Sequence, residues 1–521
     1  MEQLFKRLLD YYQIDENDYQ KLIAPVNEDN FAMGHEFKDI DKCVEVVKRA
    51  INEKKKIFIY GDYDCDGIMS ISILVKMFSY LNYPVDYYVP SRYLDGYGLT
   101  LKSAEELVAN GYQLLITVDN GITAFEGIEY AKKHGMEVLV FDHHQADEKL
   151  PLADYILHPA VSHFGDIATS AGFVTFMFTR AFLGRFDKYL ATLAAISVVS
   201  DMMPLREYNR NLLRVVIAEY SDHPFYNIDL LKDKEPFTEV SIGMRIAPKV
   251  NAVGRLVEDE ESLRKTVEFF TSEDKNLLLN YNEWINSVNN ERKDLTKLAV
   301  ENSKEIDTSK SSIIAVIQEK EGVIGLIANY FAKKYHKPTI IFALDQSGDA
   351  YKGSCRAPKG FNVVDAFNQL DKYMLTAGGH ASAGGCSVKK ECFEEFKEAF
   401  NKLAETIVIE ESEEESIDLY INEINRESYD LVQSFSPFGE TWPSPRFKLS
   451  RIRTQSLMYS RDTQHILTSI GTSSRLTGFY FPKEKISEYQ YIDTIGTLRL
   501  STYYGKTTVE YLIGEISESE K

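Results

Sequence analysis

The chain has 521 residues, of which 44% are hydrophobic and 26% charged, so it is long enough for several domains and is not largely disordered. Its 59 Lys and Arg against 79 Asp and Glu give a net charge of −20, which argues mildly against a nucleic-acid partner unless positive groups gather locally. No apolar run approaches the roughly 20 residues that cross a membrane. The five cysteines do not predict a disulfide framework, and we expect a soluble cytoplasmic protein.

Short apolar runs alternate with helical patterns in the first part of the chain. Four runs predict buried strands, at Ile57–Tyr60, Val85–Val89, Leu114–Val118 and Val138–Phe141. Amphipathic stretches such as Ile68–Leu81 lie between them. Strands that alternate with helices predict βαβ units and a parallel sheet.

The remaining chain changes character several times. Residues 160–220 are mostly helical in pattern, and apolar residues spaced by three or four from Leu277 to Leu298 predict a long helix that bridges two domains. A strand–helix–strand pattern over 312–344 predicts a second α/β unit, and the acidic run 410–415 predicts a linker. Alternating residues then predict a small β-domain with a hairpin turn at 504–506.

Three carboxylates stand within five residues directly after the first predicted strand, at Asp62, Asp64 and Asp66. Like charges this close repel one another unless a cation is bound, so the segment fits either a solvated acidic turn or a metal site. A calcium loop of the EF-hand kind is excluded, because its glutamate is missing and an apolar strand precedes the segment.

Two further strands end in acidic residues: Asp119 follows the third, and Asp142, His143 and His144 follow the fourth. Because ligands in open α/β sheets bind beyond the carboxyl ends of the strands, we expect these side chains to share one crevice. Asp201 ends an apolar helix farther along. Carboxylates with imidazoles and no thiolate suit Mn²⁺ or Mg²⁺, and several of them can hold two ions that activate water for phosphoester or phosphoanhydride hydrolysis.

The four acidic motifs resemble those of the DHH phosphoesterase superfamily. They are DYDCDG at 62–67, VDNG at 118–121, DHH at 142–144 and SDMMPL at 200–205. More narrowly, the chain is similar to the RecJ family of single-stranded-DNA-specific 5′→3′ exonucleases over roughly residues 55–515. The segments that carry this narrower resemblance are PSR at 90–92 with GYG at 96–98, APKVNAVGR at 247–255, GVIG at 322–325, KGSCR at 352–356, GGHASAG at 378–384, and PFG at 437–439 with Pro443 and Pro445.

The resemblance implies an α/β fold in four parts. These are a parallel-sheet DHH domain with an N-terminal extension at 1–265, a bridging helix at 266–305, a second α/β domain of the DHHA1 type at 306–409, and an OB-like β-domain at 416–521. The chain departs from the family at one point, because Glu440-Thr441-Trp442 follows Gly439 where glycine-rich residues are usual. This departure bears on the fine contacts of the β-domain.

The resemblance also implies roles for particular residues. The ligands of two Mn²⁺ (or Mg²⁺) ions would be Asp64, Asp66, Asp119, His143 and Asp201. Asp62 and Asp142 would orient ligands or water, and His144 would lie beside the scissile phosphate as an acid or a charge stabiliser. Substrate contacts would come from Arg92, Ser354 and Arg356 at the terminal 5′-phosphate, and from Lys249, Asn251, Arg255, Gly379 and His380 along the backbone.

The implied activity is processive exonuclease digestion of single-stranded DNA in recombination and repair, which releases nucleoside 5′-monophosphates. The implied state is a monomer, without membrane association, that works with a single-strand-binding protein or a RecQ-type helicase. One alternative is a DHH–DHHA1 phosphodiesterase of short oligonucleotides or cyclic dinucleotides, although residues 416–521 argue against it. A non-enzymatic scaffold is a third, although every motif keeps its acids and histidines.

Overall fold

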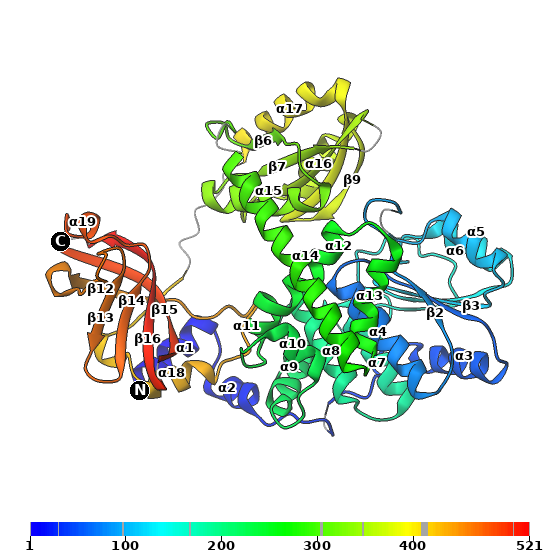
Figure 1. Cartoon of the computed structure of the whole chain (residues 1–521), viewed down its shortest axis with the longest axis horizontal. Helices are drawn as coiled ribbons and strands as arrows, with labels where there is room; N and C mark the ends of the chain where they lie inside the picture. Colours follow the sequence, from blue (N-terminus) through cyan, green and yellow to red (C-terminus); the bar gives the residue numbers. More distant parts are fainter. Residues whose placement is uncertain are drawn as a thin grey trace. The chain divides into compact units, whose positions relative to one another are not determined.

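The computed structural model describes residues 2–29, 31–95, 98–165, 168–302, 306–345, 348–407, 415–503 and 505–519 (Figure 1). Gly96 and Tyr97 of the GYG segment, 410–414 of the acidic run and Tyr504 of the hairpin turn lie outside these ranges. The chain forms two compact units. The larger comprises Ala32–Asp201 and Glu219–Ser412, and the smaller comprises Met1–Phe31, Met202–Ala218 and Glu413–Lys521. No helix within the described ranges is long and apolar enough to cross a membrane.

The larger unit contains the predicted parallel sheet, with strand order β2-β1-β3-β4-β5 and every pair parallel. Its strands are β1 Ile57–Tyr60, β2 Asp86–Tyr88, β3 Leu114–Val118, β4 Glu137–Phe141 and β5 Tyr155–Leu157. The surrounding helices are α3 Ile40–Asn52, α4 Cys65–Tyr80, α5 Leu101–Ala109, α6 Phe125–Lys133 and α7 Ala171–Leu183. Helices α5 and α6 lie on one face of the sheet and α4 and α7 on the other, which explains why the strands are apolar throughout (Figure 1).

A helical segment follows this sheet. Its elements are α8 Lys188–Ser200, α9 Glu207–Tyr220, α10 Tyr226–Lys232, α11 Glu239–Ser241, the π-helix Ile242–Ile246, α12 Ala247–Leu256, α13 Glu260–Thr271 and α14 Lys275–Asn302. The bridging helix expected over 266–305 is α14, and residues 266–271 belong to α13 instead. Helix α14 packs on α12 and α13, which precede it in the chain, and on α15 (Glu321–Tyr335) of the next domain.

The second α/β domain is built on a mixed sheet with strand order β6-β7-β8-β10-β9. Its strands are β6 Ile313–Val316, β7 Thr339–Leu344, β8 Ala350–Arg356, β9 Met374–His380 and β10 Ala383–Lys389. Its helices are α15 Glu321–Tyr335, α16 Val363–Gln369 and α17 Phe393–Thr406, with 3-10 turns at Asp371–Tyr373 and Lys390–Cys392. Phe342, Phe367 and Phe396 lie in its buried core.

The smaller unit holds a six-stranded sheet with order β11-β12-β15-β16-β14-β13. Its strands are β11 Ile417–Asp418, β12 Phe447–Arg453, β13 Ile466–Ile470, β14 Ser474–Gly478, β15 Tyr491–Tyr503 and β16 Lys506–Glu518. Its short helices are α1 Glu2–Tyr12, α2 Glu16–Ile23, α18 Arg426–Gln433 and α19 Lys483–Ile486, with 3-10 turns at Ile421–Glu423 and Thr454–Ser456. The antiparallel pairing of β15 with β16 confirms the predicted hairpin.

The N-terminal extension packs differently from the expected division of the chain. Leu4 and Leu8, one turn apart on α1, are fully buried in the same core as Phe435 and Phe447 of the β-domain. The first helices of the range 1–265, which is predicted to be the DHH domain with its N-terminal extension, therefore belong to the smaller unit. The sequence shows the apolar face of α1 but not the surface that covers it, because that surface lies more than 400 residues away.

Trp442, part of the departure from the family pattern, has a packing role. Its ring stacks on Tyr12 with the centroids 4.2 Å apart, and its Nε1 donates to the carbonyl of Phe435 at 2.9 Å. The guanidinium of Arg210 lies 5.3 Å from the Trp442 ring and donates to the carbonyl of Pro437. Trp442 thus contacts both α1 and the segment that precedes β12.

Candidate metal centre and phosphate pocket

The acidic motifs meet at the carboxyl ends of β1, β3 and β4, where the topology predicts a crevice. Asp64 caps α4, and its Oδ1 accepts from the amide of Gly67 at 3.1 Å. Asp119 ends β3 in the left-handed region, with φ 60°. This costly conformation for a residue with a Cβ places its carboxylate in the crevice with the others.

The eight motif acids and histidines lie in one cluster. Nε2 of His143 lies 3.2 Å from Oδ1 of Asp119, 3.5 Å from Oδ2 of Asp66 and 3.5 Å from Oδ2 of Asp201. Three sets of side chains could each hold an ion, with ligand atoms within 4.8 Å of one another. The sets are Asp119 with His143 and His144, Asp66 with His143 and Asp201, and Asp62 with Asp64 and Asp119.

The carboxylates destabilise one another in the absence of a cation. Burial and the charge of Asp64 raise the pKa of Asp62 to about 8 and that of Asp66 to about 6. Burial and the charges of Asp66 and Asp64 raise the pKa of Asp201 to about 8, and the pKa of Asp119 lies well above its ordinary value for the same reasons. A divalent cation would remove this repulsion.

The two histidines are held in opposite charge states. Burial lowers the pKa of His143 to about 3, so its ring is neutral and can act as a ligand. Burial also disfavours charge on His144, but the hydrogen bond from its Nδ1 to Oδ1 of Asp142, at 2.8 Å, outweighs this and raises its pKa to about 9. Asp142 is fully buried and also accepts from the amides of Ile122 and His143. It therefore fixes the conformation of the DHH segment, and its predicted role in orienting ligands or water stays a prediction.

Sequence reasoning missed the side chains that hold this cluster in place. Oγ of Ser197 donates to Asp66 at 2.6 Å, and the amides of Ala171 and Gly172 at the start of α7 donate to the same carboxylate at 2.8 Å each. Nε2 of His158 donates to the carbonyl of His144 at 2.7 Å. These partners come from distant segments, and no spacing rule connects them with the motifs.

Asn120 of the VDNG segment has a structural role that the sequence pattern does not indicate. It is completely buried, and its Nδ2 donates to the carbonyls of Tyr60, Gly61 and Val118. It thereby ties the end of β3 to the end of β1, next to the loop that bears Asp62.

The donor set fits a hard divalent cation. All donors in the three sets are carboxylate oxygens or imidazole nitrogens, which suit Mn²⁺ or Mg²⁺. Nε2 of His143 and Oδ1 of Asp62 are buried and have no hydrogen-bond partner among the described residues. Buried polar atoms without partners are costly unless an ion or a water molecule satisfies them, so they favour a bound cation here.

A cavity of about 420 Å³ contains the predicted phosphate-binding side chains. It is lined by Arg92 and Arg255 from the DHH domain, by Ser354 and Arg356 of β8, and by the first turn of α15. A helix start offers free amides to an anion, and arginine binds phosphate oxygens in a bidentate way. The three side chains predicted at the terminal 5′-phosphate, Arg92, Ser354 and Arg356, thus line one cavity, and Arg255 lines it as well.

The arginines of this cavity crowd one another. Burial, together with the charges of Arg92 and Arg356, lowers the pKa of Arg255 to about 10. Burial also lowers the pKa of Arg356, whose Nη1 donates to Oγ of Ser354 at 3.1 Å. Lys352 also lines the cavity, and its Nζ lies 3.0 Å from Oε2 of Glu321. The cavity is therefore a concentrated positive site in an acidic chain.

Lys249 and Asn251 do not line this cavity, and their predicted contact with the substrate backbone stays a prediction. Lys249 is only 5% exposed, and its Nζ donates to the carbonyl of Leu231 at 2.7 Å and to the carboxylate of Asp233 at 3.0 Å. Asn251 accepts from the amide of Cys65 at 2.8 Å. Both side chains lie on α12, where helical spacing turns Lys249 away from the face that bears Asn251 and Arg255.

Gly379 and His380 end β9 and lead into a two-residue turn to β10. Gly379 has φ 146°, and a Cβ there would lie 2.4 Å from the carbonyl oxygen of Ala383, so only glycine fits. The side chain of His380 is largely exposed, and partial desolvation of its ring, together with the charge of His144, lowers its pKa. Their predicted contact with substrate stays a prediction.

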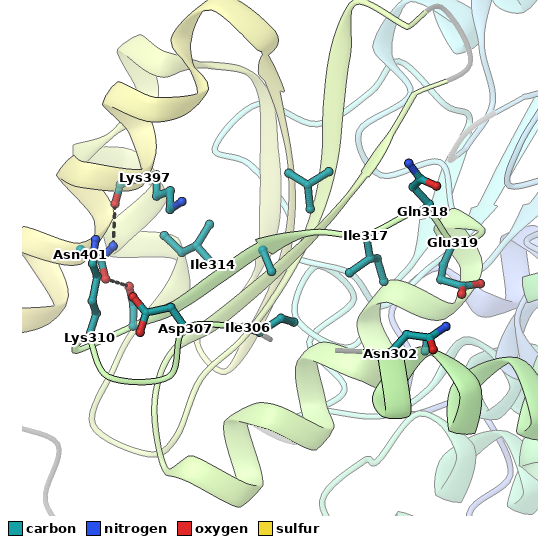
Figure 2. Close-up of a pocket in the computed structure, with 14 residues that line it drawn as sticks. Asn302, Ile306, Asp307, Lys310, Ile314, Ile317, Gln318, Glu319, Lys397 and Asn401 are labelled. Carbon is teal, nitrogen blue, oxygen red and sulfur yellow. Dashed lines mark hydrogen bonds between the residues drawn. The ribbon is translucent and has the colours of Figure 1, made fainter. Parts of the chain in front are cut away.

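A second cavity, of about 610 Å³, lies along β6. Figure 2 shows Lys397 and Asn401 of α17 at one end and Gln318 and Glu319 at the other. Asn401 is engaged internally, because its Oδ1 accepts from Oγ of Ser312 at 2.5 Å. Among the described residues that line it, no set of side chains is grouped for a metal ion.

A parallel sheet with a carboxylate–imidazole cluster at its strand ends and a second α/β domain defines a metal-dependent phosphoesterase of the DHH class. Comparisons with known proteins narrow this class. Residues 56–198 match the DHH family, N-terminal domain, residues 309–406 match the DHHA1 domain, and residues 417–515 match the RecJ OB domain.

Relatives and solved structures agree. The single-stranded-DNA-specific exonuclease RecJ of Haemophilus influenzae is 30% identical over 78% of this chain and 77% of its own length. The protein of the same name from Bacillus subtilis is 27% identical over 97% of this chain and 67% of its own. RecJ from Thermus thermophilus, crystallised with Mn²⁺, has the same fold, with TM-score 0.85, 21% identity, and coverage of 99% of this chain and 76% of that one. The chain belongs to the RecJ family.

Proposed function

We propose that this protein is a single-stranded-DNA-specific exonuclease that digests from the 5′ end and releases nucleoside 5′-monophosphates in DNA recombination and repair. The observation that carries the proposal is the arginine cavity beside the metal cluster. The charge of Arg92 contributes to the pKa of Asp62, and that of Asp64 to the pKa of Arg255, so the two sites adjoin. A terminal phosphate in the cavity would place a following phosphodiester near the cluster.

The proposed ligands of two Mn²⁺ or Mg²⁺ ions are Asp64, Asp66, Asp119, His143 and Asp201. When bound, such ions supply a hydroxide near neutral pH and neutralise charge on the attacked phosphorus. Asp62 would accept a hydrogen bond from bound water. His144, kept protonated by Asp142, would donate to the phosphate or its leaving oxygen.

The β-domain adds a surface suited to unpaired bases. Phe479 and Tyr480, in the turn after β14, are 45% and 84% exposed, and the guanidinium of Arg499 lies 5.8 Å from the Phe479 ring. Nδ1 of His465 accepts from the amide of Tyr480 at 3.0 Å and so fixes the turn. Exposed aromatic rings beside cations are the usual means of gripping single strands through base stacking.

The proposal has three further parts. The chain is divided into domains as given above, and it acts as a monomer in the cytoplasm. It cooperates with a single-strand-binding protein or a RecQ-type helicase. The matched ranges 56–198, 309–406 and 417–515 support the division. An acidic surface favours help from a partner that delivers the strand, because bulk repulsion weakens direct capture of DNA.

The test follows both ends of a long single strand. A 5′-phosphorylated DNA with separate 5′ and 3′ labels is incubated with protein and Mn²⁺, with matched duplex and RNA controls. We expect early release of 5′-labelled mononucleotide from single-stranded DNA alone. Cleavage restricted to dinucleotides would replace the proposal with the short-substrate phosphodiesterase, and no cleavage of either would leave a scaffold.

A further inference from the structure

Tyr63 stands between the two halves of the site. It lies between Asp62 and Asp64 in the chain, yet its ring lines the arginine cavity. The guanidinium carbon of Arg92 lies 4.3 Å from the centroid of this ring, within the range of a strong cation–π contact. No assigned role uses this side chain.

Arg92 depends on this ring for its placement. Its Nε is buried and has no hydrogen-bond partner among the residues that the structure describes. A long, flexible arginine with an unpaired nitrogen is ordered mainly by packing, and a planar guanidinium packs well on an aromatic face. The Tyr63 ring thus supplies the surface that orders the Arg92 guanidinium before a phosphate binds.

The backbone of Tyr63 is fixed as well. A Cβ added to Gly254 would lie 2.2 Å from the carbonyl oxygen of Tyr63, so α12 touches this loop directly. Two residues on, the amide of Cys65 donates to Asn251 of the same helix. Arg255, which follows Gly254 in α12, touches the start of α15. A Cβ added to Gly322 of α15 would lie 1.9 Å from the carbonyl oxygen of Arg255. The metal loop, α12 and the cavity are one packed body.

We propose that Tyr63 is a positioning residue that holds Arg92 over the terminal phosphate and fixes the spacing between the phosphate cavity and the metal centre. The inference rests on the proposed exonuclease function. If the spacing is fixed, the bond that meets the metal centre is always the first one after the terminal nucleotide. Tyr63 would then determine both the preference for a 5′-phosphate and the release of single nucleotides.

The test compares Tyr63→Leu, which removes the aromatic face, with Tyr63→Phe, which keeps it. The control is Tyr87→Leu, because the Tyr87 ring also lies 4.3 Å from a guanidinium, that of Arg264, and Tyr87 is outside the described cavity lining. Each variant is assayed on matched 5′-phosphate and 5′-hydroxyl single strands, and the product lengths are resolved by chromatography. Calorimetry measures Mn²⁺ binding.

We expect Tyr63→Leu to lower the ratio of kcat/KM between the two ends by about 2- to 30-fold, the span of one cation–π contact. Its products should include di- and trinucleotides, while Mn²⁺ affinity stays within about twofold. Tyr63→Phe should restore the ratio and the mononucleotide product. Tyr87→Leu should change neither.

Distinct results would overturn the inference. If wild type prefers the 5′-phosphate and Tyr63→Leu keeps the same ratio and products, Tyr63 has no positioning role and the proposed function stands. If wild type ignores the 5′-phosphate, the phosphate cavity fails and this inference fails with it. Should Tyr63→Leu not fold, Tyr63→Met provides the same comparison with a flexible side chain.

Discussion

Replacing Asp119 with alanine should abolish hydrolysis and stabilise the metal-free protein. Asp119 belongs to two of the three sets that could hold an ion, and its Oδ1 lies 3.2 Å from Nε2 of His143. Losing a ligand of the metal pair removes several kcal/mol of transition-state stabilisation, and 1.36 kcal/mol corresponds to a factor of ten in rate. We therefore expect a loss of at least about 10³-fold.

The stability change follows from the crowded carboxylates. The pKa of Asp66, raised from 3.8 to about 6 by burial and by Asp64, corresponds to about 3 kcal/mol at 1.36 kcal/mol per unit. A carboxylate whose folded pKa is raised contributes stability below its unfolded pKa and loses it as the pH rises through the folded value. Since the pKa values of Asp62 and Asp201 are about 8, metal-free wild type should lose stability between about pH 4 and pH 8. Removing Asp119 should reduce that loss by about 1–3 kcal/mol.

The measurement is urea unfolding in chelator at pH 5 and pH 7.5, with exonuclease turnover in Mn²⁺. Asp154→Ala is the control, because Asp154 bonds Lys132 and the amide of Val138 outside the cluster. That variant should lose stability at both pH values and keep its turnover. Turnover of Asp119→Ala within tenfold of wild type, or lower metal-free stability than wild type at pH 7.5, would refute the reasoning.

Two further substitutions separate the arginine cavity from its structural surroundings. Arg356→Ala should lower the preference for 5′-phosphate over 5′-hydroxyl ends by roughly 10- to 150-fold, since charge-assisted hydrogen bonds contribute about 1.5–3 kcal/mol. Paired single-turnover assays on the two kinds of end measure this preference. An unchanged preference would mean that the terminal phosphate binds elsewhere. Lys249→Met should cost about 1–3 kcal/mol in urea unfolding, because it leaves Asp233 and the carbonyl of Leu231 unpaired, and should leave kcat/KM within about twofold. A large loss of kcat/KM with unchanged stability would return Lys249 to the substrate site.

The metal cluster was accessible from sequence because of a topological rule. Parallel strands end at one edge, so acids after β1, β3 and β4 had to meet, and they do. The surroundings of Lys249 were not accessible in this way. Residues 247–256 form a helix, and six residues of helical rotation separate Lys249 from the face of Arg255, which the motif alone does not show.

Contacts between distant segments were beyond the reach of sequence patterns. The hydrogen bond from Ser197 to Asp66 spans 131 residues, and Leu8 shares a buried core with Phe435, more than 400 residues away. Periodicity shows that a face is apolar or that a carboxylate ends a strand, but it does not name the partner. The supporting residues of the site and the placement of the N-terminal helices therefore required the structure.

The net charge of −20 and the proposed action on a polyanion are reconciled by where the charges lie. Five of the acidic residues, Asp62, Asp64, Asp66, Asp119 and Asp201, lie in the metal cluster, where they would repel a phosphodiester until cations are bound. Positive groups are concentrated next to it, in the cavity of Arg92, Arg255 and Arg356. A strand end that carries a terminal phosphate offers the group that this cavity can bind, whereas an internal segment of a strand does not. Charge sorted in this way favours action at ends, which is the selectivity that an exonuclease needs.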